Sequence, residues 1–335
     1  MAASVHSSGD HARRDVSATS TRPSLLRRVR WSELLAEGAI FGVALVSILS
    51  VLLILVFVGK EALPLLTSAE VRREVTPAAL FVPHGDAGFL WQPVSADPKY
   101  NILPLFAGTL KVTLVSLVVA FPLSVLAALY VSDFAARRAR EIIKPLIELM
   151  AGVPSVVVGF FALMVLSTWV QAVFGTEHRL NALVAGLGLS FAVCPIVFSI
   201  SEEALRAVPA SYRAAALALG ATRSETLLHV VLPAAMPGIA AAGVLGFGRA
   251  IGETMIVLLA SGNAALLDAH LGRSTRTVTA TIAQELGEVV VGSPHYHVLF
   301  ALGALLFLST LAVNLAGERI VRHMRGTRRA SAEAP

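Results

Sequence analysis

Two residues of opposite charge, Arg249 and Glu253, interrupt an otherwise apolar stretch of the chain. Their spacing of four places both side chains on one face of a helix. A guanidinium presents a fork of N–H donors that matches a tetrahedral oxyanion. A carboxylate beside it could accept a hydrogen bond from a protonated oxyanion, which a fully ionised one could not donate. The pair predicts a substrate path or gate, and a purely structural ion pair between helices is the alternative.

The depth of Arg249 favours the functional reading. If the fifth apolar segment begins near Pro237, Arg249 lies twelve residues further on, or about 18 Å at about 1.5 Å per residue. That distance is close to the centre of a hydrocarbon layer about 30 Å thick. Charged groups at this depth are costly and normally face a water-filled path or a partner. The order with the base first is also the less favourable one for an ion pair on a helix.

Other residues that could do chemistry give weaker signals. His295 and His297 have no nearby cysteine or clear third ligand, so we expect them at the outer interface and expect no metal site. The single cysteine, Cys194, excludes a disulfide within the chain. The sequence has no Gly-x-x-x-x-Gly-Lys-Ser/Thr loop and no recognisable set of nucleophile, base and orienting group. We therefore expect no cofactor and no ATP hydrolysis by this chain, so that any ATP energy would come from another subunit.

Composition indicates that helices in a membrane position these residues. Of 335 residues, 56% are hydrophobic and 15% are charged, against roughly 25% charged in soluble domains. Six apolar segments are long enough to cross a bilayer, which predicts an all-α polytopic membrane protein with six transmembrane helices. The first one follows several arginines, as in a signal peptide, but exceeds the usual apolar length of about 7–15 residues, so we expect a retained span. The segments are Ala39–Gly59, Val112–Val131, Leu149–Gly175, Asn181–Ile200, a span within Ile239–Leu267, and Val298–Ala316.

The distribution of positive charge predicts the orientation. With six spans, both termini, the basic loop Asp133–Lys144 and the stretch 201–238 lie on one side, which carries eighteen Lys and Arg residues against eight on the other. The positive-inside rule makes that side cytoplasmic. The predicted organisation is a disordered cytoplasmic tail (1–37), a first transmembrane helix (38–60), an irregular periplasmic or extracellular segment with five prolines (61–103), a transmembrane domain (104–318) and a basic cytoplasmic tail (319–335).

The stretch 201–238 has the start and stop signals of a helix, a tight turn and a second helix. Pro209 suits the first turn of a helix over 210–219, and Gly220 stands where a left-handed cap would fall. Thr222 and Glu225 form a capping box for the second helix, which we expect Pro233 and Pro237 to interrupt. Such an element on the cytoplasmic side predicts a docking site. On the outer side, residues 277–291 predict an interfacial helix that could form a gate or a plain surface helix.

The same stretch resembles the "EAA" loop of ABC importer permeases. The matching positions are Ala214, Ala215, Ala216, Gly220, Val230, Leu232 and Pro233. The spacing is kept, although Ala214 stands where the family has glutamate and Val230 where it has isoleucine. The resemblance implies that the loop forms a coupling helix seated in a cleft of a cytoplasmic ATPase subunit.

Further motifs resemble the permeases of phosphate importers, the PstC and PstA families, and those near the carboxyl end are more similar to PstC. The matching segments are Trp91–Pro93, Ile102–Pro104, Ala151–Ser155, Glu203–Pro209, Gly248–Thr254, Ala260–Asn263 and His295–His297. The resemblance covers roughly residues 89–318. It implies a type I (MetI-like) importer permease fold and transport of inorganic phosphate across a bacterial inner membrane.

The resemblance also implies partners: a PstA-like sister permease, PstB-like ATPase subunits and a PstS-like extracytoplasmic phosphate-binding protein. Two alternatives stay open at this point. One is a permease for another oxyanion or a phosphonate, and the other is a membrane sensor or scaffold that reports phosphate without carrying flux. The arginine-rich ends are explained by membrane topology rather than by nucleic-acid binding.

Overall fold

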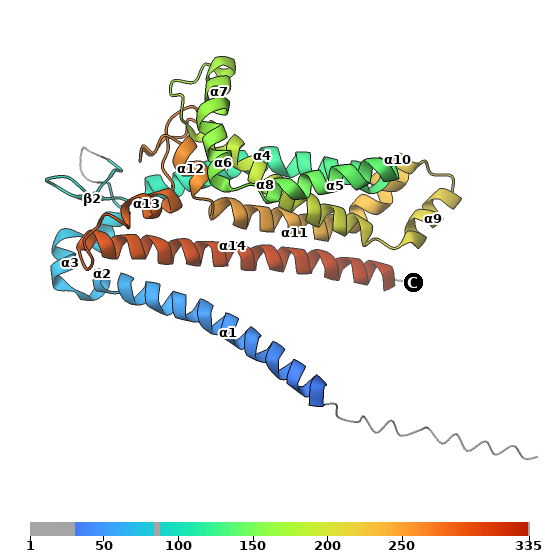
Figure 1. Cartoon of the computed structure of the whole chain (residues 1–335), viewed down its shortest axis with the longest axis horizontal. Coiled ribbons are helices and arrows are strands. Elements are labelled where there is room, and N and C mark those ends of the chain that lie inside the picture. Colours follow the sequence, from blue (N-terminus) through green and yellow to red (C-terminus); the bar gives the residue numbers. More distant parts are fainter. Residues whose placement is uncertain (1–30, 84–87, 334–335) are drawn as a thin grey trace, which may run out of the picture. The chain divides into compact units, whose positions relative to one another are not determined.

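The computed structural model describes residues 31–83 and 88–333. Within these ranges the chain is mostly helical, and its only sheet is a hairpin in which β1 (Trp91–Gln92) pairs antiparallel with β2 (Lys99–Tyr100). Six helical stretches of the described residues are long and apolar enough to cross a membrane (Figure 1). The predicted number of spans is confirmed. Their bounds are Leu35–Thr67, Leu103–Phe134, Ser155–Phe174, Ala182–Arg206, Arg223–Ile251 and Pro294–Met324.

The first helix, α1 (Trp31–Ala62), is longer than predicted at both ends. It begins inside the predicted tail 1–37, whose residues 1–30 lie outside the described part of the chain. The boundary between two compact units falls within α1, between Leu53 and Ile54. Every contact of the site lies in the second unit.

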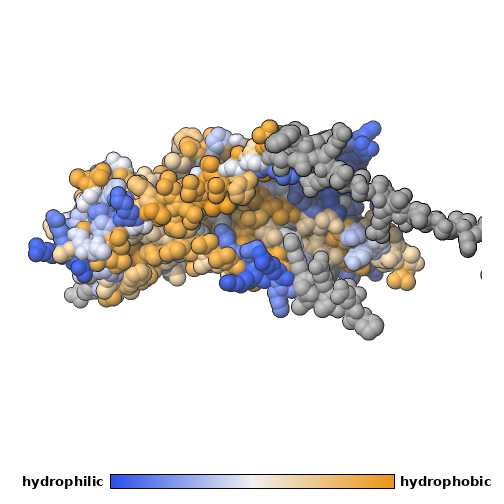
Figure 2. Space-filling view, turned by 90° about the horizontal axis from the view of Figure 1, so that it is seen from below, coloured by the Kyte–Doolittle hydropathy of each residue, from blue (hydrophilic) through white to orange (hydrophobic). Residues whose placement is uncertain are grey.

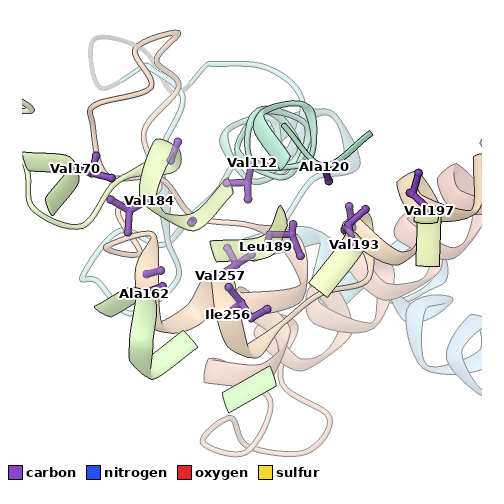
Figure 3. Packing of buried hydrophobic residues seen from close by; sticks show 14 of the residues in the cluster. Val112, Ala120, Ala162, Val170, Val184, Leu189, Val193, Val197, Ile256 and Val257 are labelled. Carbon is purple, nitrogen blue, oxygen red and sulfur yellow. The ribbon is translucent and has the colours of Figure 1, made fainter. Parts of the chain in front are cut away.

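Three helices form the centre of this second unit: α4 (Leu103–Leu129), α8 (Ala182–Arg206) and α11 (Leu232–Ile251). Small residues let them approach closely; a Cβ on Gly186 of α8 would lie 2.4 Å from the Val115 side chain of α4. Figure 3 shows the buried side chains between these helices and their neighbours, an apolar core that holds α11 in place. The labelled members are Val112, Ala120, Ala162, Val170, Val184, Leu189, Val193, Val197, Ile256 and Val257.

The predicted basic loop is instead helical. A π-helical turn, η3 (Tyr130–Phe134), ends the second span, and α5 (Arg137–Ala151) follows. The reason is long-range: Lys144 of α5 lies 3.0 Å from the carboxylate of Glu202 on α8, whose side chain is fully buried. Gly152 caps the carboxyl end of α5. The third span then runs through α6 (Ser155–Phe161), η4 (Ala162–Leu166) and α7 (Ser167–Phe174).

The fifth span starts earlier than predicted, and its prolines do not interrupt it. Helix α10 (Arg223–Thr226) continues through a π-helical turn, η5 (Leu227–Val231), into α11. In that turn the Leu232 N–H donates to the carbonyl of Leu227, five residues back. The wider turn leads into α11 with Pro233 in its first positions, where a missing N–H costs little. The prediction of an interruption was wrong because it assumed a regular α-helix.

Short elements gather at one end of the unit, opposite α9 (Ala210–Ala218) (Figure 1). They are α2 (Pro64–Thr67), α3 (Ala69–Glu74), the 3-10 turn η1 (Pro77–Leu80), the β hairpin and α13 (Val278–Glu285). An apolar core holds them against the start of α14 (Pro294–Glu333), and it includes Leu65, Val75, Trp91, Tyr100, Val278 and Leu299. A helix predicted within residues 277–291 is thus confirmed over eight of them.

Many apolar side chains remain exposed on the outside of the helices. Figure 2 shows hydrophobic residues over much of the visible face and hydrophilic ones gathered at its left end and toward the right. Phe41 and Leu53 of α1, for example, are exposed by about two thirds or more. An exposed apolar surface of this extent fits a lipid environment.

Candidate functional site

Arg249 and Glu253 form an ion pair at the end of α11. The distance from Arg249 Nη2 to Glu253 Oε2 is 3.3 Å. Helix α11 ends at Ile251, so Glu253 lies just beyond the helix rather than on it. The chain nevertheless keeps a helix-like turn there, since the Glu253 N–H donates to the carbonyl of Ala250 at 3.3 Å. The two side chains therefore meet as the spacing predicted.

The two partners differ in burial. The Glu253 side chain is 4% exposed, and the Arg249 side chain is 47% exposed. Glu253 stands where α11 gives way to α12 (Met255–Ala260), which packs on α6 and α8. Its carbonyl accepts a hydrogen bond of 2.8 Å from Thr279 Oγ1 on α13. The backbone of Glu253 is thus fixed by α11 and α13 and its carboxylate is paired with Arg249, whereas the half-exposed guanidinium offers further N–H donors to an anion.

The exposed face of α11 is the one that carries Arg249. The other faces are occupied: a Cβ on Gly246 would meet Val197 of α8 at 2.7 Å, and one on Gly248 would meet Asn314 of α14 at 3.4 Å. Leu245, one turn before Arg249 and on the same face, is 53% exposed. Arg249 therefore points away from the packed interior of this chain. An enclosed path at this position requires a second surface opposite α11.

The predicted helix–turn–helix stretch is present at the other end of the unit. Gly220 follows α9 with φ of 88°, the left-handed conformation that its position predicted. The capping box is confirmed, with the Thr222 N–H 2.8 Å from Glu225 Oε2 and the Glu225 N–H 3.3 Å from Thr222 Oγ1. Pro209 is the residue that caps α9 rather than part of its first turn.

Apolar side chains project from α9 and the turn after it. Leu219 is 90% exposed, Tyr212 is 51% exposed and Leu217 is 47% exposed. These three residues are called the α9 apolar surface. Sequence reasoning missed them, although large apolar residues in a polar stretch are a signal of docking. The positions matched to the EAA pattern divide between two places: Ala214 and Ala215 are exposed on α9, whereas Leu232 and Pro233 are half-buried at the start of α11.

One arginine that the sequence did not single out anchors α9. Arg213 Nε lies 3.2 Å from Asp133 Oδ1 in η3. Its other nitrogens donate to the carbonyls of Val208 and Leu205, at 3.1 Å each. Leu205 lies in the last turn of α8 and Val208 two residues beyond its end, where the helix has no backbone donors left for its last carbonyls. Arg213 thus ties α9 to both the second and the fourth spans.

The two histidines at the start of α14 have separate partners. His295 Nε2 lies 2.9 Å from Glu285 Oε2, and His297 Nδ1 lies 2.7 Å from the carbonyl of Glu61. Among the described residues, no group of three or more His, Cys, Asp or Glu side chains is arranged to hold a metal ion. The histidines join the outer segment to α13 and α14.

Two groups outside the membrane-spanning helices, Tyr100 and Asp268, have a shifted pKa. Burial, together with a hydrogen bond to Glu74, raises the pKa of the Tyr100 hydroxyl above its usual value. The His270 N–H and the Arg273 guanidinium, which both donate to Asp268, lower the pKa of that carboxyl. Arg273 also lies 3.1 Å from Glu177, so it bridges two outer loops.

Comparison with known proteins identifies relatives over most of the chain. A family model described as "binding-protein-dependent transport system inner membrane component" matches residues 120–326. The probable ABC transporter permease protein YqgH of Bacillus subtilis is 34% identical over 240 residues, which cover 71% of this chain and 76% of that protein. Phosphate transport system permease protein PstC 1 of Mycobacterium tuberculosis is also 34% identical, over 68% of this chain and 74% of its own length.

Solved structures share the fold at low identity. A bacterial ABC transporter involved in the import of the acidic polysaccharide alginate matches with a TM-score of 0.58 and 15% identity, over 88% of this chain and 98% of that chain. The inward-facing MetNI methionine ABC transporter matches with a TM-score of 0.51 and 19% identity, over 67% and 94%. At these identities the likeness concerns the fold alone.

Proposed function

The chain belongs to the family of binding-protein-dependent transport system inner membrane components, and from this premise we propose that its substrate is inorganic phosphate. Membership makes it a multi-pass permease subunit of an ABC importer, not an enzyme. The expected all-α fold of six spans, the MetI-like permease fold, is confirmed. Relatives named for phosphate transport support the choice of substrate.

The observation that carries the proposal is the Arg249–Glu253 pair. The half-exposed guanidinium would donate two parallel hydrogen bonds to oxygens of phosphate. The buried carboxylate of Glu253, 3.3 Å away, would then accept a hydrogen bond from a P–OH group. Sulfate has no proton to donate at neutral pH, and its negative charge would be repelled by an unbridged carboxylate. The pair thus both attracts an oxyanion and favours a protonated one.

The exposure of Arg249 supports a path shared with a second permease. The face of α11 that carries Arg249 and Leu245 has no covering element from the described part of this chain. A PstA-like sister permease placed against this face would close a path around the guanidinium. An extracytoplasmic PstS-like binding protein would deliver phosphate to its outer end.

The α9 apolar surface supports coupling to a PstB-like ATPase. Leu219 and its neighbours offer an exposed apolar anchor, and Gly220 allows the tight turn that presents it. Closure of the ATPase subunits would displace α9. Because α10, η5 and α11 are continuous, this displacement would reach Arg249 through one helical rod.

This assignment requires that the two ends of the unit face opposite sides of the membrane. We place α9, both termini and α5 in the cytoplasm, and the segment 61–103 with α13 outside, following the positive-inside rule. The transmembrane domain would then be residues 104–318. Figure 1 shows α9 and α13 at opposite ends of the unit, as this orientation needs.

Uptake of labelled phosphate into liposomes that contain the chain and its partner subunits tests the function. We expect phosphate uptake that depends on ATP. Protonated oxyanions such as arsenate should inhibit this uptake, and sulfate should not. Phosphate binding without flux would instead indicate a sensor, and strong competition by a phosphonate would reassign the substrate. Arg249→Gln should abolish uptake at normal protein level. Arg137→Gln is the matched control, since Arg137 forms the same base-first pair with Glu141 on the exposed side of α5, at 2.9 Å.

A further inference from the structure

The backbone carbonyl of Glu253 is bound by α13, whereas its N–H is bound by α11. Thr279 Oγ1 donates to the Glu253 carbonyl at 2.8 Å, across 26 residues of chain. The backbone bond that starts α12 runs from the Leu258 N–H to the carbonyl of Thr254, one residue further on. The Glu253 carbonyl is therefore satisfied from α13. A shift of α13 would displace the peptide that carries the carboxylate paired with Arg249.

The first turn of α13 is fixed to the second span. Thr277 caps the helix, with its Oγ1 3.3 Å from the Ala280 N–H. The next N–H, of Val278, donates to Thr109 Oγ1 of α4 at 3.1 Å. Val278 and Thr277 are both buried. Helix α13 is thus seated on α4 at the end that also presents Thr279 to Glu253.

The last turn of α13 carries Glu285, on which three segments converge. Glu285 accepts a hydrogen bond from Trp91 Nε1 at 3.0 Å and from His295 Nε2 at 2.9 Å, and its Oε1 forms an ion pair with Arg276 Nη2 at 2.7 Å. Trp91 belongs to the β hairpin of the outer segment, and His295 belongs to the first turn of α14. The Glu285 side chain is only 15% exposed, so these donors hold it in a specific position.

We propose that α13 positions Glu253 according to the state of the outer segment, with Thr279 as the positioning residue at one end and Glu285 as the link at the other. The proposal rests on the proposed role of the Arg249–Glu253 pair. Binding of a partner that displaces Trp91 from Glu285 would shift α13, and Thr279 would carry this shift to Glu253. The segment 61–103 thereby gains a function: it adjusts the carboxylate of the substrate path from outside the membrane.

Conservative variants of Thr279 test the first contact. In liposomes with the complete transporter, Thr279→Val removes the hydroxyl at constant shape and should lower the maximal rate of phosphate uptake about fivefold, the effect of one hydrogen bond. Thr279→Ser keeps the donor and should restore the rate. The concentration of loaded binding protein at half-maximal uptake should stay unchanged in both. Equal maximal rates for the Val and Ser variants would overturn the proposal.

A neighbouring threonine serves as the matched control. Thr281 is buried on the same helix, but its hydroxyl donates to the Thr277 carbonyl of its own helix at 2.8 Å. Thr281→Val should leave uptake near the wild-type rate. If Thr281→Val lowers uptake as much as Thr279→Val, the loss reflects α13 stability and the proposal fails. If the Val variant accumulates poorly, Thr279→Ala, which adds no bulk, can replace it. The Ala variant should show the same reduced rate of phosphate uptake per assembled transporter.

A double-mutant cycle tests the link to the outer segment. Trp91→Phe removes one donor to Glu285 while keeping an aromatic ring in the core. If α13 connects the two contacts, Trp91→Phe combined with Thr279→Val should lower uptake by less than the product of the single effects. Strictly multiplicative effects would overturn the link. Glu253→Gln distinguishes failure of the proposed function from failure of this inference. Normal phosphate uptake by Glu253→Gln would refute the role of the charge pair itself. Reduced uptake by Glu253→Gln together with normal uptake by Thr279→Val would refute only the inference about α13.

Discussion

Arg213 and Asp133 join α9 to the end of the second span, with 3.2 Å between Nε and Oδ1. The remaining nitrogens of the same guanidinium reach the carbonyls that end the fourth span. A partner that moves α9 would therefore act on two spans through one side chain, besides acting on the fifth span through the chain itself. Both side chains are largely buried, at 26% and 19% exposed, so solvent screens this pair less than a surface pair.

Removal of the Arg213 anchor should uncouple α9 from these spans. Arg213→Gln loses the ion pair and leaves Asp133 without this partner, which costs about 1.5–3 kcal/mol for hydrogen bonds to a charged group. We expect ATP-driven uptake to fall about tenfold or more, with ATP hydrolysis retained. Asp133→Asn should act on the same contact, so the double variant should be no worse than the more severe single one. Additive losses would show that the two residues work separately.

The turn at Gly220 can be tested through its backbone conformation alone. A Cβ on Gly220 would meet no neighbouring atom within 4 Å, so any effect of a side chain comes from φ of 88°. Valine is strained there by about 1–2 kcal/mol or more, whereas asparagine tolerates the left-handed region. We expect Gly220→Val to abolish phosphate uptake while leaving the protein in the membrane. Gly220→Asn should retain uptake, and full uptake by the Val variant would refute this placement of the docking turn.

Leu219 offers a test of docking with little effect on folding. Its side chain is 90% exposed, so Leu219→Ser removes almost no packing within this chain. If an ATPase subunit covers it, the loss of one buried leucine should weaken the association by about 1.5–3 kcal/mol. Val94 of the outer segment is 89% exposed, and Val94→Ser is the matched control. Co-purification of the ATPase should fall for the first variant and not for the second; an equal yield for both would remove Leu219 from the interface.

Local patterns in the sequence predicted local structure well. The Thr222–Glu225 capping box and the left-handed Gly220 depend on residues within a few positions of each other, and both are confirmed. The six apolar segments likewise predicted six spans. The extent of the fifth span did not follow from local rules. The π-helical turn η5 accommodates Pro233, so that the helix is continuous from Arg223 onward.

Contacts between distant residues explain what the sequence left open. Helix α5 was predicted as a loop because its anchor, Lys144 on Glu202, joins residues 58 positions apart. The bond from Trp91 to Glu285 spans 194 positions, and no periodicity or spacing reports such a contact. For the charge pair, the spacing predicted that Arg249 and Glu253 would meet. Their unequal burial did not follow from the spacing, because Glu253 lies beyond the end of α11, where its carbonyl accepts a hydrogen bond from Thr279 of α13.

The acidity of Asp268 predicts how the outer loops respond to pH. Hydrogen bonds from the His270 N–H and from Arg273 lower the pKa of Asp268 in the folded protein. A lowered pKa means that the carboxylate stabilises the loop above its unfolded pKa of about 3.9, and that this contribution is lost as the pH falls through the lower, folded value. The protection of residues 268–273 against hydrogen exchange, taken relative to the intrinsic rate at each pH, should therefore fall under acid conditions. Asp268→Asn should exchange quickly already at neutral pH, and an unchanged rate in that variant would contradict the assignment.

Glu253 should decide which oxyanion passes Arg249. In the proposed site its carboxylate, 3.3 Å from the guanidinium, would accept a hydrogen bond from a protonated oxyanion and would repel a fully ionised one. Glu253→Gln replaces it with an amide that also donates, so the variant no longer requires a protonated oxyanion. We expect phosphate uptake to fall about tenfold, since a charge-assisted hydrogen bond is lost, and sulfate to become an effective competitor. Glu253→Asp, which keeps the charge on a shorter side chain, should lower uptake and still exclude sulfate. Sulfate competition measured side by side in the wild type and both variants checks this, and exclusion of sulfate by the Gln variant would show that selectivity lies elsewhere.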